Sequence, residues 1–263
     1  MRLYRVNALM LKYWYVATQR IDRILDVFYW PLIGMLVWGF TTYYISDLVQ
    51  DNSIVRMFLG GAILWTFFTI AQADIGVFIL EDFWSRNIFN LFASPMKNSE
   101  LIISTALFGF FRSIISFLFL ILIAFLLYSF NLLSIGVTYI FIFASGLILF
   151  GWVIGIFVTA MIFRYTSRVQ IFAWTIAWLV QPFSAVFYPL SSLPIWLKSI
   201  SLLFPTTYIF EGMRTALNNE VMDWQNLGIS FGINIVLLIV AYIFFENSVK
   251  VAKKKGTITK YHE

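Results

Sequence analysis

The sequence contains no cysteine and a single histidine, His262. Without cysteine the chain can form neither a disulfide nor a thiolate metal site. It also has no HExxH motif and no cluster of carboxylates and histidine that would hold a metal ion. His262 lies in a basic tail, too near the last residue to indicate a nucleophile and base pair. These absences argue against catalysis by this chain.

A phosphate-binding loop is absent as well. Such a loop needs glycines followed by lysine and then serine or threonine, and no glycine in this sequence precedes a lysine. The chain therefore carries no ATP-binding motif of its own. Any step driven by ATP would take place on a separate subunit.

Charged residues make up only 12% of the sequence, against about 25% in a typical soluble domain. Hydrophobic residues reach 61%, aromatic residues 20% and the mean hydropathy is +0.85. This composition predicts an all-α membrane protein with many spans and, over residues 1–263, a single transmembrane domain. The net charge of +5 comes from basic residues beside apolar runs, which indicates anionic membrane lipid as a partner and not nucleic acid.

Six apolar runs are predicted to cross the membrane, because each reaches or nearly reaches the length of about 20 residues that a crossing helix needs. They cover residues 24–45, 57–80, 101–128, 135–163, 169–187 and 227–245. Lysine and arginine gather at both ends of the chain and in the connections after the second and fourth runs. Since such residues favour the cytoplasmic side, both termini are predicted to be cytoplasmic.

Residues 1–23 are predicted to form an amphipathic helix that lies on the membrane. At 100° per residue, the basic side chains fall in one arc of roughly 100° and apolar side chains fill the opposite side. The polar arc holds Arg2, Arg5, Lys12, Gln19, Arg20 and Arg23, and the apolar side holds Leu3, Val6, Met10, Tyr13, Trp14 and Ala17. Leu9 and Val16 fall on the polar side. An ordinary basic flank before the first span is the alternative, whereas a cleaved signal peptide is not expected, because the apolar stretch that follows is too long.

Residues 181–217 are apolar but hold four of the six prolines, Pro182, Pro189, Pro194 and Pro205. Proline removes a backbone donor and clashes with the preceding turn, so this run is predicted to be cut into short helices. One would begin at Pro194 and the next at Thr206 or Thr207, ending at Leu217 before Asn218 and Asn219. Pieces this short cannot cross a bilayer, which favours an external re-entrant hairpin sheltered by protein.

The connection over residues 81–97 shows apolar residues at helical spacing, namely Trp84, Ile88, Leu91 and Phe92. Glu81 and Asp82 favour a helix amino terminus and Pro95 a helix stop. The sequence therefore predicts a cytoplasmic amphipathic helix. It would rest on lipid headgroups or fill a groove on a partner protein.

A few charged residues fall within or between the apolar runs. Asp74 and Arg112 are placed so that an intramembrane pair is possible, either as a polar element near a substrate path or gate, or as a static bridge. A further alternative is that Asp74 is wetted from the cytoplasm. Glu211 and Arg214 stand three residues apart on one helix face, where a local pair is allowed. Arg56 and Glu246 lie at span ends and need no special role.

Aromatic and glycine residues suggest further roles within the spans. Aromatic side chains could line a pathway or instead form interfacial belts and packing contacts. The candidates are Tyr29, Trp30, Trp38, Tyr43, Tyr44, Trp65, Phe67, Phe68, Trp174 and Trp178. Two Gly-x-x-x-Gly motifs, at Gly151 and Gly155 and at Gly228 and Gly232, permit close contact between helices.

An ordered set of short motifs carries a resemblance to a known family. The motifs are Phe187-Tyr188-Pro189-Leu190, Leu193-Pro194-x-Trp196-Leu197, Phe204-Pro205-Thr206-Thr207-Tyr208 and Glu211-Gly212-x-Arg214. Together they resemble the region before the last span of ABC-2 type transporter permeases. The Leu91-x-x-Ser94-Pro95 ending of the cytoplasmic connection is similar to the end of the coupling helix in that family.

The resemblance implies a permease subunit of an ATP-driven exporter in the plasma (inner) membrane of a prokaryote. It would pair with a second, usually identical, permease and with two ATP-binding subunits that hold ATP and Mg²⁺, and would move an amphipathic lipid-linked glycan, lipid or drug by alternating access. Coupling to the ATPase would fall to Glu81, Asp82, Trp84, Arg86, Ile88, Leu91, Phe92 and Pro95. The external hairpin or gate would hold Pro189, Pro194, Pro205, Tyr208, Glu211 and Arg214. Asp74, Arg112, Tyr29, Trp30, Trp174 and Trp178 are the candidates for the pathway.

Two other classes of function remain as alternatives. A secondary transporter would work without an ATPase, and it usually shows internal repeats and more intramembrane charges than this sequence has. A membrane scaffold that transports nothing would need no external hairpin.

The topology is testable because the chain has no cysteine of its own. Cysteines introduced singly at Asn52, Asn131 and Asn219 should react with an impermeant thiol reagent in intact cells, since the charge bias puts these sites outside. A cysteine at Asn90 should react only after the membrane is opened. Labelling of intact cells at Asn90 but not at Asn219 would contradict this orientation.

Overall fold

The computed structural model describes residues 2–51, 53–218 and 222–256. Asn52, Asn219 and His262, which the sequence singled out, lie outside these residues. The described part of the chain is built from helices and contains no strand. This confirms the predicted all-α class.

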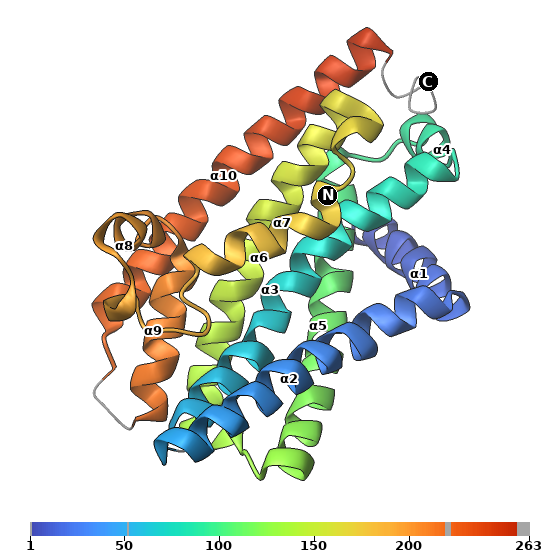
Figure 1. Ribbon diagram of the computed structural model, residues 1–263. Helices are drawn as coiled ribbons and strands as arrows, with labels where there is room; N and C mark the ends of the chain where they lie inside the picture. Colours follow the sequence, from blue (N-terminus) through green and yellow to red (C-terminus); the bar gives the residue numbers. More distant parts are fainter. Residues whose placement is uncertain (1, 52, 219–221, 257–263) are drawn as a thin grey trace.

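Five helices are long and apolar enough to cross a membrane. They are α2 (Ile21–Val49), α3 (Ser53–Trp84), α5 (Asn98–Tyr128), α6 (Val137–Tyr165) and α10 (Trp224–Lys255). Helix α1 (Leu3–Gln19) precedes them and lies at the end of the bundle that also carries α4 (Ile88–Ala93) and the last turns of α10 (Figure 1). We call this end of the molecule the α4 end.

The remaining elements are short and follow α6 or connect the long helices. The α-helices are α7 (Phe172–Val180), α8 (Ile195–Ser201) and α9 (Pro205–Leu217). The 3-10 turns are η1 (Leu132–Ile135), η2 (Thr166–Val169), η3 (Gln181–Phe183) and η4 (Leu190–Ser192). Helices α8 and α9 occupy the stretch in which the prolines predict two short helices, with Pro194 just before α8 and Pro205 as the first residue of α9.

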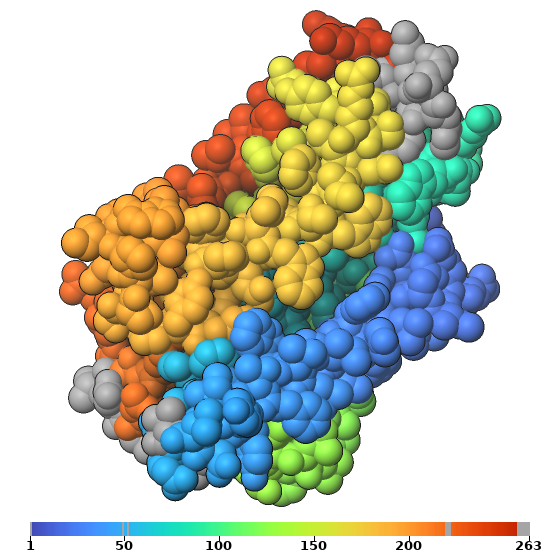
Figure 2. Space-filling view, viewed as in Figure 1, coloured from blue at the N-terminus to red at the C-terminus, as the bar shows by residue number. Residues whose placement is uncertain are grey.

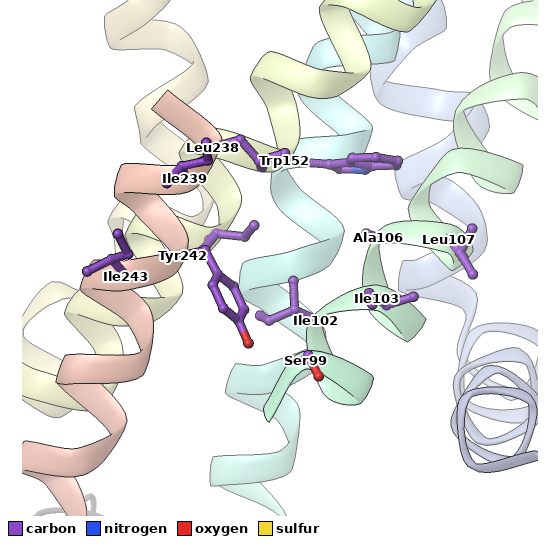
Figure 3. Close-up of a pocket in the computed structure, with 11 residues that line it drawn as sticks. Ser99, Ile102, Ile103, Ala106, Leu107, Trp152, Leu238, Ile239, Tyr242 and Ile243 are labelled. Atoms are coloured by element: carbon purple, nitrogen blue, oxygen red, sulfur yellow. The ribbon is translucent and has the colours of Figure 1, made fainter. Parts of the chain in front are cut away.

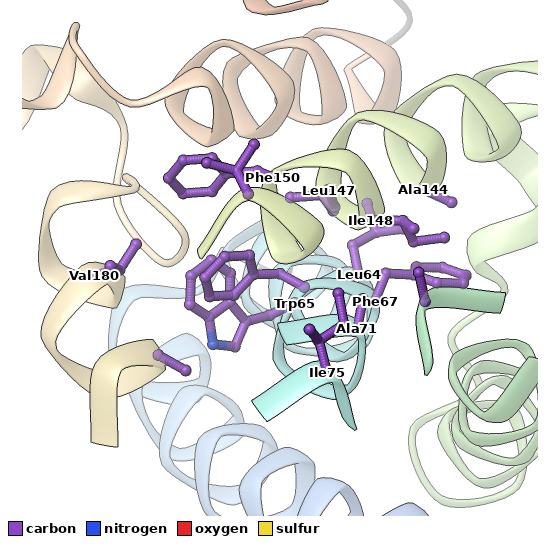
Figure 4. Close-up of a cluster of buried hydrophobic side chains, with 14 of the residues drawn as sticks. Leu64, Trp65, Phe67, Ala71, Ile75, Ala144, Leu147, Ile148, Phe150 and Val180 are labelled. Atoms are coloured by element: carbon purple, nitrogen blue, oxygen red, sulfur yellow. The ribbon is translucent and has the colours of Figure 1, made fainter. Parts of the chain in front are cut away.

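Helix α3 is the centre of the bundle, and 89% of the residues in its 18-residue apolar stretch are buried. Helices α2, α5, α6, α7 and α9 all pack against it (Figure 1). Its side chains Leu64, Phe67 and Ala71 meet Leu147 and Phe150 of α6 in the core shown in Figure 4. Helix α10 stands outside this layer and packs on α6 and α9, and α1 packs on α5.

The two Gly-x-x-x-Gly motifs have different surroundings. A Cβ added at Gly151 would lie 2.9 Å from the Phe68 carbonyl oxygen, and one at Gly155 would lie 2.8 Å from the Gln72 carbonyl oxygen. The first motif therefore lets the backbones of α3 and α6 approach closely. At Gly228 and Gly232 on α10 an added Cβ would meet nothing within 4 Å. The second motif therefore packs against no helix in the described part of the chain.

The predicted span over residues 169–187 is not a single helix. It consists of a 3-10 turn, the nine-residue helix α7, and a second 3-10 turn that holds Pro182. Proline at this position removes a helical hydrogen bond, which explains why α7 stops at Val180. The segment still runs along α3, because Ala173 lies against Gly76 and the Val186 carbonyl lies against Gly61.

The contrast between the glycines gives a stability prediction with a built-in control. Gly155→Ala should lower the free energy of unfolding by about 1–3 kcal/mol, because its Cβ meets backbone that cannot move aside. Gly228→Ala should be neutral or stabilise by up to about 1 kcal/mol, because alanine favours the helix and has free space. Thermal unfolding of the purified variants in detergent measures both. Equal melting temperatures would contradict the close α3–α6 contact.

Candidate functional site

A network of ion pairs fixes the α4 end of the bundle. On α1, Arg5 lies 3.5 Å from Glu100 of α5, and Lys12 pairs with Asp82 of α3. At the start of α2, Arg20 and Arg23 approach Glu81 to 2.9 Å and 2.6 Å. The basic side of the predicted interfacial helix thus faces acidic groups of the same chain. The opposite charge beside each group offsets part of the cost of removing it from water.

Some apolar side chains of α1 are buried in the protein, and others are exposed. Val6, Leu9 and Tyr13 are buried, and Tyr13 packs on Phe78 of α3 with ring centroids 4.8 Å apart. Leu9 lies on the polar arc by helical spacing, so its burial differs from the prediction. Leu3 and Trp14 are exposed, as a helix resting on a membrane requires.

Asp74 and Arg112 do form a pair in the interior. One guanidinium nitrogen of Arg112 donates to Asp74, and the other donates to the carbonyl oxygen of Arg23 at 2.7 Å. Both side chains are buried. Because Arg23 itself pairs with Glu81, the interior pair is joined to the network at the α4 end. The sequence allowed this pair but gave no sign of the bond to the α2 backbone.

The connection over residues 81–97 differs from its prediction. Glu81 and Asp82 do not begin a separate helix: α3 continues through them to Trp84, because Arg20, Arg23 and Lys12 neutralise their charges. The chain then turns at Arg86, whose φ is +58°, and forms α4, which has six residues. Pro95 follows α4 and precedes α5, as the sequence predicts for a helix stop.

The exposed side of this connection matches the predicted stripe only at Trp84. Ile88 is buried within the chain, and Phe92 packs edge-on against Phe163 of α6. The exposed aromatic side chains are Trp84 and Phe89, at 41% and 42%. Helical spacing placed Ile88, Leu91 and Phe92 on one face but could not tell whether that face meets this chain or a partner.

Trp84 also connects α3 with α7. Its ring stacks on Trp174 with centroids 5.9 Å apart and planes only 12° from parallel. A side chain at the α4 end is therefore in direct contact with the broken segment that follows α6. Helical spacing had assigned Trp84 to the connection and gave no sign of this contact.

A hollow runs between α2 and α7, with α3 as its floor (Figure 2). Between Leu59 and Leu80, a stretch described in full, every α3 residue is buried except Ala62, Thr69 and Ala73, which share one helix face. The helices on its two sides carry exposed aromatic side chains that the sequence proposed for a pathway, Tyr29 and Trp30 on α2 and Trp174 and Trp178 on α7. The small floor residues were not predicted, since nothing in their spacing distinguishes them from packing residues.

Other aromatic candidates lie elsewhere. Trp65, Phe67 and Phe68 are buried in the α3 core and line no open surface. Trp38 stacks on Phe187 with ring centroids 4.4 Å apart, and so helps to hold the broken segment against α2. Tyr43 and Tyr44 are exposed near the end of α2.

Helices α8 and α9 meet at a buried break around Pro205. The Ser230 hydroxyl of α10 donates to the Pro205 carbonyl oxygen at 2.7 Å, and the Thr207 hydroxyl donates to the Ser201 carbonyl oxygen at the same distance. Thr206 and Thr207 are buried. Phe204 stacks on Phe183, so the break is packed against the end of the segment that contains α7.

The predicted pair between Glu211 and Arg214 is present and does more than join two turns of α9. Arg214 lies 2.9 Å from Glu211 and donates to the Ala185 carbonyl oxygen, also at 2.9 Å. Glu211 accepts from the backbone N–H of Leu190. Ala185 has a φ of +49°, an unfavourable conformation for alanine, and the bond from Arg214 helps to hold it. The pair thus fastens α9 to residues 185–190.

The remaining residues predicted for the hairpin have structural contacts of their own. The Tyr208 hydroxyl donates to the Leu202 carbonyl oxygen at 2.9 Å, across the α8–α9 turn. Pro189 has an extended backbone and precedes the 3-10 turn η4.

Comparison with known proteins gives a family match over most of the chain. The model of the ABC-2 family transporter protein matches residues 39–245. This range begins within α2, covers α3 to α9 completely and ends within α10. A comparison with curated proteins finds no match.

The interior pair can be tested by a double-mutant cycle. Asp74→Asn and Arg112→Gln should each lower the stability by about 3–5 kcal/mol, because each leaves an unpaired buried charge. The double variant should lose less than the sum of the two. The exposed pair of Arg20 and Asp22 is the control, and Asp22→Asn should cost at most about 1 kcal/mol. Additive losses for Asp74 and Arg112 in thermal unfolding would mean that the two side chains do not interact.

Proposed function

Because the chain belongs to the ABC-2 family of transporter proteins, we propose that it is the permease subunit of an ATP-driven exporter. The family generally works with an ATP-binding subunit. ATP and Mg²⁺ would be held by that partner, since the sequence of this chain has no glycine followed by lysine. The membrane would be the inner membrane of a prokaryote.

The observation that carries the proposal is the continuous path from the exposed connection at the α4 end to the hollow. Phe89 and Trp84 are exposed at this end, and Trp84 stacks on Trp174 of α7, the helix on one side of the hollow. A partner that moves the connection would therefore move α7 directly. This is the arrangement that coupling between ATP hydrolysis and a substrate path requires.

The hollow between α2 and α7 supports an amphipathic substrate. The exposed aromatic side chains of α2 and α7 and the alanines and threonine of the α3 floor offer apolar contact with a few hydroxyl groups. A lipid-linked glycan, a lipid or a drug-like molecule has both kinds of surface. On a single chain the hollow is open on one side (Figure 2), and a second copy of the permease would close it into a pathway.

The chain would cross the membrane six times if the broken segment over residues 166–187 forms the fifth crossing. It starts beside Arg164 at the α4 end and reaches Gly61 near the opposite end of α3. Both termini then lie in the cytoplasm, as the charge bias predicts. Helices α8 and α9 form a re-entrant hairpin whose break at Pro205 lies inside the protein, and which serves as the external gate.

The surface that meets the ATP-binding subunit can be tested at Phe89. Phe89→Asp should reduce co-purification of an identified ATP-binding-cassette subunit about tenfold and abolish stimulated ATP hydrolysis, because a charge must enter an apolar contact. Leu133→Asp, which changes an equally exposed apolar residue at the opposite end, should leave both unchanged.

Ile88→Asp serves as a second comparison, because Ile88 is buried in this chain and its replacement should lower the amount of folded permease. Size-exclusion chromatography separates that effect from loss of the partner. Normal co-purification and ATP-driven transport by the Phe89→Asp protein would rule out the connection as the coupling surface.

A further inference from the structure

A cavity of about 490 Å³ lies between α5, α6 and α10, away from the hollow formed by α2, α3 and α7. Its walls are apolar side chains, among them Ile102 and Ala106 of α5, Ile156 of α6 and Ile239 of α10 (Figure 3). The hydroxyl groups of Ser99 and Tyr242 mark one end (Figure 3). The cavity exists because α10 packs on α6 and α9 and leaves α5 uncovered on this side.

All residues that line the cavity belong to helices long and apolar enough to cross the membrane. Ile239 and Ile243 at its rim are more than half exposed, so it opens toward the surroundings of these helices. At that depth the surroundings are hydrocarbon, which admits an apolar occupant and excludes a soluble partner.

The size of the cavity favours a lipid chain over a helix. Two turns of a helix about 10 Å wide and about 11 Å long would fill roughly 850 Å³, which exceeds the space available. A volume of about 490 Å³ instead falls within the range of about 300–1,000 Å³ found for small-molecule sites.

Glu246 gives the Tyr242 end of the cavity its chemistry. One carboxylate oxygen accepts from the Tyr242 hydroxyl at 2.8 Å, and the other accepts from the Asn98 side-chain amide at 2.9 Å. Both donors are neutral. The other carboxylates described at the α4 end all pair with a basic side chain: Asp22, Asp26, Glu81, Asp82 and Glu100. Glu246 has no such partner within the described part of the chain, so its charge is free to meet a cation.

We propose that this site binds a phospholipid with a primary amine in its headgroup. One acyl chain fills the cavity, and the ammonium group of an ethanolamine headgroup donates to Glu246. Lys97, directly before Asn98, and Lys250, one turn beyond Glu246, are exposed and suit the lipid phosphate. A headgroup without an amine would leave Glu246 unpaired and would be repelled by it. The site is independent of transport and occupies a different face from the proposed pathway.

The test is retention of defined lipids by the full-length permease. The protein is reconstituted in nanodiscs with equal amounts of phosphatidylethanolamine and phosphatidylglycerol, extracted in mild detergent, and its bound lipids are counted by native mass spectrometry. The wild-type protein should retain the ethanolamine lipid about tenfold over the glycerol lipid, the effect of one charge-assisted hydrogen bond. Equal retention of the two lipids, or preference for phosphatidylglycerol, would overturn the proposal.

Matched variants separate the headgroup from the acyl chain. Glu246→Gln keeps the shape of the side chain but removes its charge. It should bring the ratio of retained phosphatidylethanolamine to phosphatidylglycerol close to one. Ala106→Phe should fill the cavity and lower retention of both lipids, whereas Leu122→Phe, at an exposed position of the same helix, should not. Asp223→Asn, at the far end of α10, should retain the wild-type preference.

Unchanged melting temperatures verify that each variant is folded. A wild-type preference in folded Glu246→Gln would show that this carboxylate does not select the headgroup. Undiminished retention by folded Ala106→Phe would show that the chain does not occupy the cavity.

Discussion

The close contact between α3 and α6 is the constraint on which the rest of the structure depends. Between helices surrounded by lipid, burial of apolar surface gives little driving force, so association relies on packing and on hydrogen bonds. Gly151 and Gly155 bring the α6 backbone against the carbonyl groups of Phe68 and Gln72. This places α3 at the centre, and the other helices arrange themselves around it. The one narrow face of α3 left uncovered, at Ala62, Thr69 and Ala73, becomes the floor of the hollow.

Charge pairing determines how the α4 end attaches to that core. Four basic side chains from α1 and α2 meet Glu81, Asp82 and Glu100, and Arg112 ties Asp74 to the Arg23 backbone. An unpaired charge at this depth would cost several kcal/mol, whereas the paired groups fix α1 and α2 in one position. The same pairing explains why α3 continues past two acidic residues instead of ending there. Glu246 stands apart from this network because its donors are neutral.

The sequence predicted elements well where local chemistry decides them, and poorly where contacts decide them. The prolines predicted the breaks that flank α8 and α9, and the three-residue spacing of Glu211 and Arg214 predicted that they pair. The prediction that Glu81 and Asp82 begin a new helix was wrong, because these residues are stabilised within α3 by residues about 60 to 70 positions away in the sequence. Ile88 and Phe89 are neighbours, yet one is buried and the other exposed, and helical spacing alone cannot decide which side meets a partner. The Trp84–Trp174 stack and the small floor of the hollow depend on the tertiary arrangement and leave no local signal.

These contacts distinguish a core of long helices from a segment built of short ones. The glycine contact and the ion pairs lock α3, α5 and α6 together with α1 and the start of α2. The segment from η2 to α9 is instead built of short helices joined by breaks at Pro182 and Pro205, and separate contacts hold its parts, among them Arg214 with the Ala185 carbonyl and Ser230 with the Pro205 carbonyl. Short elements joined at breaks can shift as units without unravelling a helix. Trp84 touches this segment at the α4 end, and the stack of Phe204 on Phe183 joins it to the break between α8 and α9. In the proposed transport cycle, motion at the connection would therefore reach the hairpin through α7, while the core that forms the floor would stay in place.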